Sequence, residues 1–191
     1  MIETFHIRDA YPSDARFLAE CILAGMHFWD FEGDLDDEMS MILNGITECE
    51  KRTDTLYTHT RTRVAEVGGT PVAALLSYPG ELYKDLRDRT FREYWPAFFV
   101  EHAGDDPETD PGEYYLDSLA VLPAFRHQGI GTAMLEDGIR RGIEEGFTRI
   151  ALVADSTMPH LVSLYESLGF TPAEHRHAFG TDFLRMLYTV K

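Results

Sequence analysis

Apolar and polar residues follow two different periods along this chain, and the changes of period divide it into helices and strands. Apolar side chains recur every three or four positions in five segments, and this spacing predicts helices at residues 12–26, 35–50, 81–102, 129–145 and 159–168. Shorter alternating or continuously apolar runs predict strands at residues 4–8, 61–67, 72–78, 114–121, 149–154, 173–178 and 183–190.

Helix- and turn-forming residues mark where these elements begin and end. Ser13 is a candidate N-cap for the first helix, and Gly68-Gly69 between two strand-like runs predicts a β-hairpin. Pro96 predicts a kink within the third helix, and Gly169 predicts the end of the last one. The sequence shows no internal repeat and no linker, so we expect one domain over residues 1–191.

The composition is that of a folded protein. Of the 191 residues, 44% are hydrophobic, which is enough to form a core. No apolar run approaches the roughly 20 residues that a membrane span needs, and the first residues lack the apolar stretch of a signal peptide. We therefore expect a cytoplasmic protein in which Cys21 and Cys49 are reduced thiols. No CxxC pair or His/Cys cluster predicts a metal site.

The formal net charge of −16 argues against nucleic acid as a partner, because binding to phosphates needs basic patches. The same charge is compatible with a cationic substrate such as an amine. Residues 101–113 form a loop by their Pro, Gly and Asp content. This acidic loop runs directly into a predicted strand and could overhang an acceptor site; its carboxylates are Glu101, Asp105, Asp106, Glu108, Asp110 and Glu113.

The most informative segment is YYLDSLAVLPAFRHQGIG at residues 114–131, which combines a strand, a turn and a glycine-rich loop that opens a helix. Such a loop turns several backbone N–H groups toward one point at the positive end of a helix dipole. Gly129 and Gly131 are suited to this role, because a Cβ would keep an anion from the backbone and would penalise positive φ. The segment therefore predicts a ligand that carries phosphates.

Two motifs in this region resemble the GNAT superfamily of acyl-CoA N-acetyltransferases. The strand LDSLAV, Pro123 and the R-x-x-G-x-G spacing of Arg126, Gly129 and Gly131 are similar to its acetyl-CoA-binding motif. The segment LYESLGF at residues 164–170 is similar to its second hallmark. The motifs occur in the family's order, separated by one helix and one strand, and the resemblance covers residues 61–190 clearly.

The resemblance implies an α+β fold with three layers (α/β/α). Its sheet is mixed, twisted and mostly antiparallel, with about seven strands, and its parallel central strands splay apart to admit pantetheine. The strand groups that would pair with pantetheine belong to Leu119, Ala120 and Val121. The loop amides that would hold the pyrophosphate are those of His127, Gln128, Gly129, Ile130, Gly131 and Thr132, with Arg126 as a further phosphate contact.

Catalytic roles also follow from the resemblance. Tyr165 stands where many family members carry the acid that protonates the departing thiolate. The resemblance does not identify the general base, because Tyr115 and Val153 stand at the two strand positions where some members have a glutamate. Asp117, on the binding strand, is the leading candidate.

Other candidates for the base are Glu113 and Asp155, and deprotonation through a chain of waters is a further alternative. Met158 replaces an asparagine that many members carry seven residues before the tyrosine. This departure affects one polar contact, to pantetheine or to the fifth strand, rather than the fold. His175 and His177 lie on one face of a late strand without an evident third metal ligand. Aromatic residues near the acceptor side, each more often core than substrate contact, are Phe28, Trp29, Phe31, Tyr94 and Trp95.

The resulting hypothesis is an enzyme that transfers an acetyl group from acetyl-CoA to a primary amine, carried by a small molecule or a protein, with a homodimer possible. The length of the acyl group stays open. A catalytically silent acyl-CoA sensor on the same fold is the main alternative. A dinucleotide-binding oxidoreductase is disfavoured, because Met134 stands where the third glycine of its fingerprint belongs.

Overall fold

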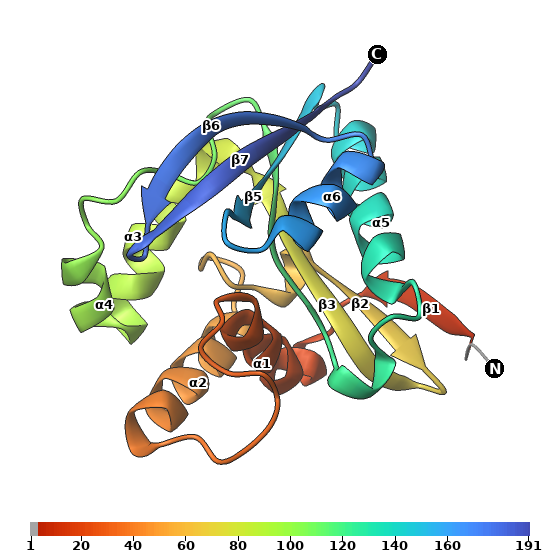
Figure 1. Cartoon of the computed structure of the whole chain (residues 1–191). Coiled ribbons are helices and arrows are strands. Elements are labelled where there is room, and N and C mark those ends of the chain that lie inside the picture. The colour runs from red at the N-terminus through yellow and green to blue at the C-terminus, as the bar shows by residue number, and fades with distance from the viewer. Residues whose placement is uncertain (1–3) are drawn as a thin grey trace.

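The computed structural model describes residues 4–191 and contains a seven-stranded sheet in the order β1-β2-β3-β4-β5-β7-β6 (Figure 1). Neighbouring strands are antiparallel, except for the parallel pair β4 and β5. The strands are β1 (Phe5–Asp9), β2 (Thr62–Val67), β3 (Thr70–Pro79), β4 (Tyr114–Val121), β5 (Arg149–Asp155), β6 (Thr171–Ala178) and β7 (Thr181–Thr189).

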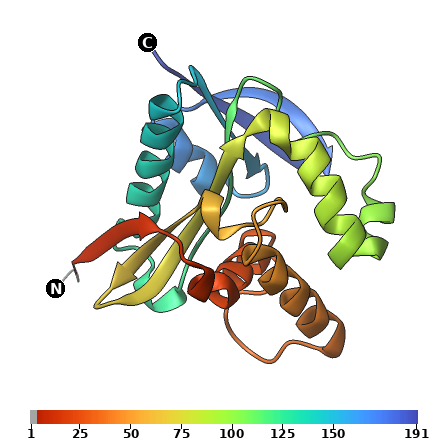
Figure 2. The same cartoon turned by 180° about the vertical axis from the view of Figure 1, so that it is seen from behind.

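Helices cover both faces of this sheet, as the two opposite views show (Figures 1 and 2). They are α1 (Ala15–Gly25), α2 (Asp37–Glu50), α3 (Tyr83–Tyr94), α4 (Pro96–Glu101), α5 (Ile130–Glu144) and α6 (Pro159–Ser167). Helices α1–α4 pack on one face, and α5 and α6 pack on the other. This arrangement confirms the predicted three-layer α+β fold with a mixed, mostly antiparallel sheet.

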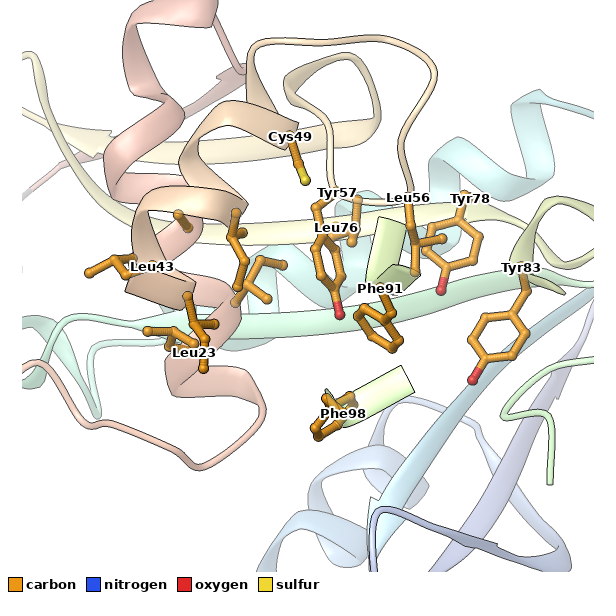
Figure 3. Packing of buried hydrophobic residues seen from close by; sticks show 14 of the residues in the cluster. Leu23, Leu43, Cys49, Leu56, Tyr57, Leu76, Tyr78, Tyr83, Phe91 and Phe98 are labelled. Atoms are coloured by element: carbon orange, nitrogen blue, oxygen red, sulfur yellow. The ribbon is translucent and has the colours of Figure 1, made fainter. Parts of the chain in front are cut away.

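The alternation of strand side chains places separate cores on the two faces of the sheet, and a smaller third cluster lies under α1. Tyr114 packs with α5 and α6, whereas Tyr115, the next residue on β4, packs with α1–α4. The core that contains Tyr115 is rich in aromatic residues, and Figure 3 shows Tyr57, Tyr83 and Phe91 in it. This cluster of α1–α4, β3 and β4 residues forms one wall of the site described below.

The structure differs from the prediction at the start of the first helix and within the third. Ser13 is not the N-cap: it lies in a 3₁₀ turn (Pro12–Asp14), and the carboxylate of Asp14 instead accepts the N–H of Tyr11 at 2.7 Å. Asp14 also pairs with Arg8, and α1 begins without a hydrogen bond from a side-chain cap. Pro96 breaks the predicted third helix into α3 and α4 at Trp95, as expected for a residue without an N–H.

The sheet opens between its two parallel strands. Cα pairing between β4 and β5 is limited to Tyr114 with Ile150 and Tyr115 with Ala151. From Leu116 to Val121, β4 is paired with β3 but not with β5. That edge of β4 therefore has no strand partner from β5, which leaves it available to a ligand.

A β-bulge interrupts β4 at the same place. Leu75 and Ser77 of β3 are separated by one residue, but their partners Leu119 and Leu116 are separated by two. The additional residue lies at Asp117 or Ser118. A bulge of this kind changes the direction of a side chain, and here Asp117 and Ser118 both face the side of the sheet covered by α1–α4, toward Tyr78 and Gly25 respectively.

The acidic loop of residues 101–113 is fixed to the β6–β7 hairpin by its own carboxylates. Asp105 accepts the N–H of Phe179 at 2.7 Å, and Asp106 accepts the N–H of His177 at 2.9 Å. Glu113 is fully buried and forms an ion pair with Arg185. These contacts between segments about 70 residues apart hold the loop against the sheet. In the described part of the chain, no helix has the length and hydropathy of a membrane span.

Candidate functional site

A cleft of about 870 Å³ lies where β4 and β5 part. Ten residues were predicted to bind the cofactor, and the structure brings eight of them to the walls of this cleft: Leu119, Ala120, Val121, Arg126, His127, Gly129, Gly131 and Thr132. The side chains of Gln128 and Ile130 do not line it. Gln128 donates its amide to the Ala124 carbonyl, and Ile130 is buried in the core. Only the backbone of these two residues could serve a ligand.

The loop before α5 has the conformation that an anion cradle requires. His127 and Gly129 are left-handed, with φ of +59° and +81°, and α5 begins directly afterwards at Ile130. The amides of Ile130, Gly131 and Thr132 belong to the first turn of this helix, so they have no partner within it. Three N–H groups therefore lie unpaired within the helix, at the positive end of its 15 residues, and its first turn lines the cleft at Gly131 and Thr132.

The space around the two loop glycines fits a phosphate-bearing ligand. A Cβ at Gly129 would meet no atom within 4 Å, and one at Gly131 would make only ordinary contacts, 3.7 Å from Val121. Packing within the protein therefore does not demand glycine at Gly131. At Gly129 the positive φ does demand it. The room left at both positions suits the close approach of a diphosphate to the backbone.

Arg126 has partners of its own. Its Nε donates to the carbonyl of Val121 at 3.0 Å, and its two terminal nitrogens pair with Asp30. The predicted phosphate contact would compete with this ion pair. Asp30 belongs to the segment after α1, so the pair closes one side of the cleft mouth.

Tyr165 of α6 lines the cleft together with Leu161 and Leu164 of the same helix. Its ring packs edge-on against Phe170, with centroids 6.2 Å apart. Burial raises the pKa of the Tyr165 phenol to about 12 and is the sole cause of that shift. No hydrogen bond from a described residue occupies the hydroxyl. A neutral phenol with a free proton therefore stands in the cleft.

A second cavity, which we call the acceptor cavity, has a volume of about 280 Å³. It shares residues with the cleft, which place the two spaces side by side: His27, Phe28, Asp117, Asp155, Met158 and Phe183. Aromatic residues make up much of its remaining wall, among them Tyr57, Tyr83, Phe91 and Phe179.

Asp117 lies at the junction of the two spaces. The Tyr78 hydroxyl donates to one carboxylate oxygen, and the Ser118 hydroxyl donates to the other at 2.8 Å. Burial raises the pKa of Asp117, although both hydrogen bonds act in the opposite direction. The leading candidate for the base is thus held at the entrance to the acceptor cavity, on the bulge of β4.

Glu108 is a second carboxylate in the acceptor cavity, and its role was not predicted beyond membership of the acidic loop. It accepts hydrogen bonds from Tyr83 at 3.1 Å and from Tyr115 at 3.2 Å. Burial, reinforced by the charge of Asp117, raises the pKa of Glu108 to about 8. Asp117 and Glu108, which we call the carboxylate pair, line the same cavity, and the charge of Asp117 disfavours the ionised form of Glu108. Tyr115, on β4, thus contacts a glutamate that comes from the acidic loop.

The two other candidates for the base have different surroundings. Glu113 lines neither space and is enclosed by Arg185, Thr109 and the Asp110 amide. Asp155 lines both spaces, but the hydroxyl and the N–H of Thr157 hold its pKa below the usual range. A carboxylate with a lowered pKa is a weaker proton acceptor than the pair of Asp117 and Glu108.

The remaining residues singled out from the sequence divide between core and cleft. Phe28 and Trp29 line the cleft, whereas Phe31 packs beside α1 and Trp95 stacks on Phe98. His177 is hydrogen-bonded to Asp182 at 2.7 Å. Over residues 4–191 there is no group of three His, Cys, Asp or Glu side chains placed to hold a metal ion.

Glu108, Tyr78 and Arg87 are functional candidates that sequence reasoning did not find. Each reaches the acceptor cavity or Asp117 from a different element. A buried tyrosine or arginine has no period or motif that marks it. The one available signal was the high density of carboxylates before the binding strand, which did not show that Glu108 is the carboxylate of this loop that lines the acceptor cavity.

A glycine loop at a helix N-terminus beside two parting parallel strands defines the class of acetyltransferases with this three-layer fold. Residues 28–170 match the acetyltransferase (GNAT) family, and the chain belongs to that family. A mycothiol acetyltransferase from Corynebacterium aurimucosum (strain ATCC 700975 / DSM 44827 / CIP 107346 / CN-1) is 36% identical over 73 residues. That match covers 38% of this chain and 23% of the relative, so the chain spans under a quarter of the curated protein it matches.

Solved structures share the fold. One acetyltransferase superposes with a TM-score of 0.76 at 24% identity and covers 97% of this chain and 100% of its own. An N-acetyltransferase from Staphylococcus aureus Mu50 has a TM-score of 0.78 at 20% identity, with coverages of 95% and 99%. The PaiA N-acetyltransferase from Thermoplasma acidophilum, solved in complex with coenzyme A, has a TM-score of 0.56 at 16% identity, with coverages of 97% and 99%.

Proposed function

We propose that this protein transfers an acetyl group from acetyl-CoA to a primary amine of a small molecule. The observation that carries the proposal is the meeting of two spaces at Asp117. One is a cleft with a phosphate cradle and a free phenol, and the other is an aromatic cavity with two carboxylates. The first fits an acyl-CoA and the second fits an ammonium group.

The cleft residues have separable tasks in this reaction. The amides of Ile130, Gly131 and Thr132 bind the diphosphate, and the open edge of β4 around Leu119 pairs with the pantetheine amides. A backbone N–H on that edge can also stabilise the oxygen of the thioester as it gains negative charge. Acetyl-CoA supplies the activated acyl group; the protein supplies position and charge stabilisation.

Proton transfers complete the scheme. The substrate enters as an ammonium ion and passes one proton to the carboxylate pair of Asp117 and Glu108, which leaves a neutral amine. Its nitrogen forms the new N–C bond while the C–S bond breaks. Tyr165 donates its proton to the departing sulfur and is reprotonated, through water, by the proton that the amine nitrogen still carries in excess. The carboxylate pair releases its proton to solvent, which restores the starting state. General acid help of this kind is worth roughly 10²–10⁴-fold in rate.

The small-molecule acceptor is favoured by the size of the acceptor cavity. Its volume of about 280 Å³ lies just below the roughly 300–1,000 Å³ of typical small-molecule sites. A catalytically silent sensor would need the same cleft but would have no use for carboxylates with raised pKa values beside it.

The test is a thiol-release assay with acetyl-CoA over a panel of amines, with the acetylated product identified by mass spectrometry. Turnover with at least one small primary amine is expected. Binding of acetyl-CoA without turnover of any amine would support the sensor instead. Thermal stabilisation by NAD and not by acetyl-CoA would reject both.

A further inference from the structure

Arg87 of α3 lines the acceptor cavity and has no task in the reaction described above. It is 7% exposed, and its Nη2 donates to the carbonyl of His102 at 2.9 Å. Its Nη1 is 3.6 Å from the Asp88 carboxylate, outside hydrogen-bond range. The buried Nε has no hydrogen-bond partner in the described part of the chain. The wall of the cavity therefore contains a buried cation with an unused donor.

Aromatic rings fix the position of this cation. The guanidinium carbon of Arg87 lies 5.4 Å from the ring centre of Phe91 and 5.9 Å from those of Tyr83 and Phe179. These rings come from α3 and from the β6–β7 turn. Cation–π contacts hold a guanidinium in place, but they do not satisfy its N–H groups. A buried charge with unmet donors is costly unless a partner arrives.

The buried charge of Arg87 is not accounted for by an ion pair with Glu108. The two side chains line the same cavity, and the positive charge of Arg87 is near enough to lower the pKa of Glu108. No ion pair or hydrogen bond between them occurs among the described contacts. A cation and a carboxylate thus face one cavity without touching, and this leaves room for a ligand with complementary charges at its two ends.

We propose that the acceptor amine also carries a carboxylate, as a small amino acid does, and that Arg87 binds this carboxylate. This inference rests on the proposed function. The ammonium end lies at Asp117, next to the cleft, and the aromatic wall accommodates an apolar side chain. A net charge of −16 repels an anionic group at long range. A carboxylate therefore needs a local cation with planar donors, and a guanidinium supplies it.

The experiment compares matched acceptors that differ only in the carboxylate: phenylalanine with phenethylamine, and leucine with isoamylamine. Wild-type protein is expected to have the higher kcat/KM for the amino acid of each pair. In R87Q the ratio within each pair is expected to fall by roughly tenfold or more, the value of a hydrogen-bonded charge pair. R87K should restore part of the ratio, because it keeps the charge.

R89Q is the matched control. Arg89 lies on the same helix, is half exposed and does not line the acceptor cavity. The same loss of charge there should leave the ratio unchanged. A purely structural role for Arg87 would lower kcat/KM for both members equally and keep the ratio, and this result would overturn the inference.

The remaining outcomes separate this inference from the proposed function. If wild-type protein acetylates the amines without a carboxylate as well as or better than the amino acids, the inference is wrong and the proposed function stands. If no amine of either kind is acetylated, both are wrong.

Discussion

Arg126 of the glycine loop and Asp30 of the segment after α1 form an ion pair across the mouth of the cleft, with Nη1 and Oδ2 3.0 Å apart. The two residues are 96 positions apart in the sequence. Asp30 therefore places a negative charge beside the loop that we propose to bind a diphosphate. It also pairs with Arg126, the side chain of that loop predicted to contact a phosphate.

We expect D30N to tighten the binding of acetyl-CoA. The substitution removes a repelling charge and releases Arg126 for the phosphates. Because the pair is largely exposed, Kd should fall by roughly two- to fivefold, and the effect should shrink at high salt. Calorimetric titration at two ionic strengths measures this. D34N, at an exposed residue of the same segment, is the control for net charge. Weaker binding by D30N would instead mean that the pair preorganises the site.

Y165F should separate chemistry from binding. Loss of the phenol proton is expected to lower kcat by roughly 10²-fold, while Kd for acetyl-CoA stays within about twofold because the ring is retained. Y188F is a matched control, since Tyr188 packs on the same Phe170 with centroids 5.9 Å apart but does not line the cleft. Single-turnover kinetics and calorimetry give the two quantities. Unchanged kcat in Y165F would remove Tyr165 from the acid role.

The acid limb of the pH profile should report the carboxylate pair. A carboxyl with a raised pKa keeps its proton at lower pH, so the pair gains capacity to accept a proton as pH rises through the pKa of Glu108, about 8. We expect kcat/KM to rise across that range. In E108Q the limb should move to lower pH, because the group with the pKa of about 8 is removed and Asp117, whose pKa burial raises against two hydrogen bonds, remains.

E101Q is the control for this pH profile. Glu101 is an exposed carboxylate at the start of the acidic loop, and its removal should leave the limb in place. An acid limb at the same pH in E108Q as in the wild type would contradict the assignment of the pair.

Glu50 at the end of α2 predicts a pH-dependent stability. It is fully buried, and neither carboxylate oxygen has a hydrogen-bond partner over residues 4–191. Burial raises the pKa of Glu50 well above its usual 4.5, so the folded protein keeps a proton that the unfolded chain has lost. The free energy of unfolding therefore falls as pH rises above that value, by at most about 1.4 kcal/mol per pH unit.

E50Q should remove this dependence. We expect its stability relative to the wild type to increase between pH 5 and pH 8 and to reach a gain of roughly 1–3 kcal/mol. Urea unfolding at both pH values measures the difference. E48Q, at a mostly exposed position of the same helix, should change stability by under about 0.5 kcal/mol at either pH. A difference between E50Q and the wild type that stays constant with pH would show that Glu50 is ionised when folded.

The sequence made the elements and the loop predictable because their causes are local. Helical and strand periods located both layers of helices and the strands, and the glycine spacing located the turn at Gly129. The bulge at Asp117 was not predictable, because it depends on the register between β3 and β4. The inward position of Glu108 is held by hydrogen bonds from Tyr83, 25 residues earlier, and from Tyr115, and no local pattern records the contact with Tyr83.

A crystal structure of the protein with acetyl-CoA tests the central claim most directly. We predict the diphosphate within hydrogen-bond distance of the amides of Ile130, Gly131 and Thr132. The thioester should lie between β4 and β5, with its sulfur beside the Tyr165 hydroxyl and its acetyl group facing Asp117. Acetyl-CoA bound outside this cleft, or its thioester pointing away from the acceptor cavity, would contradict the account.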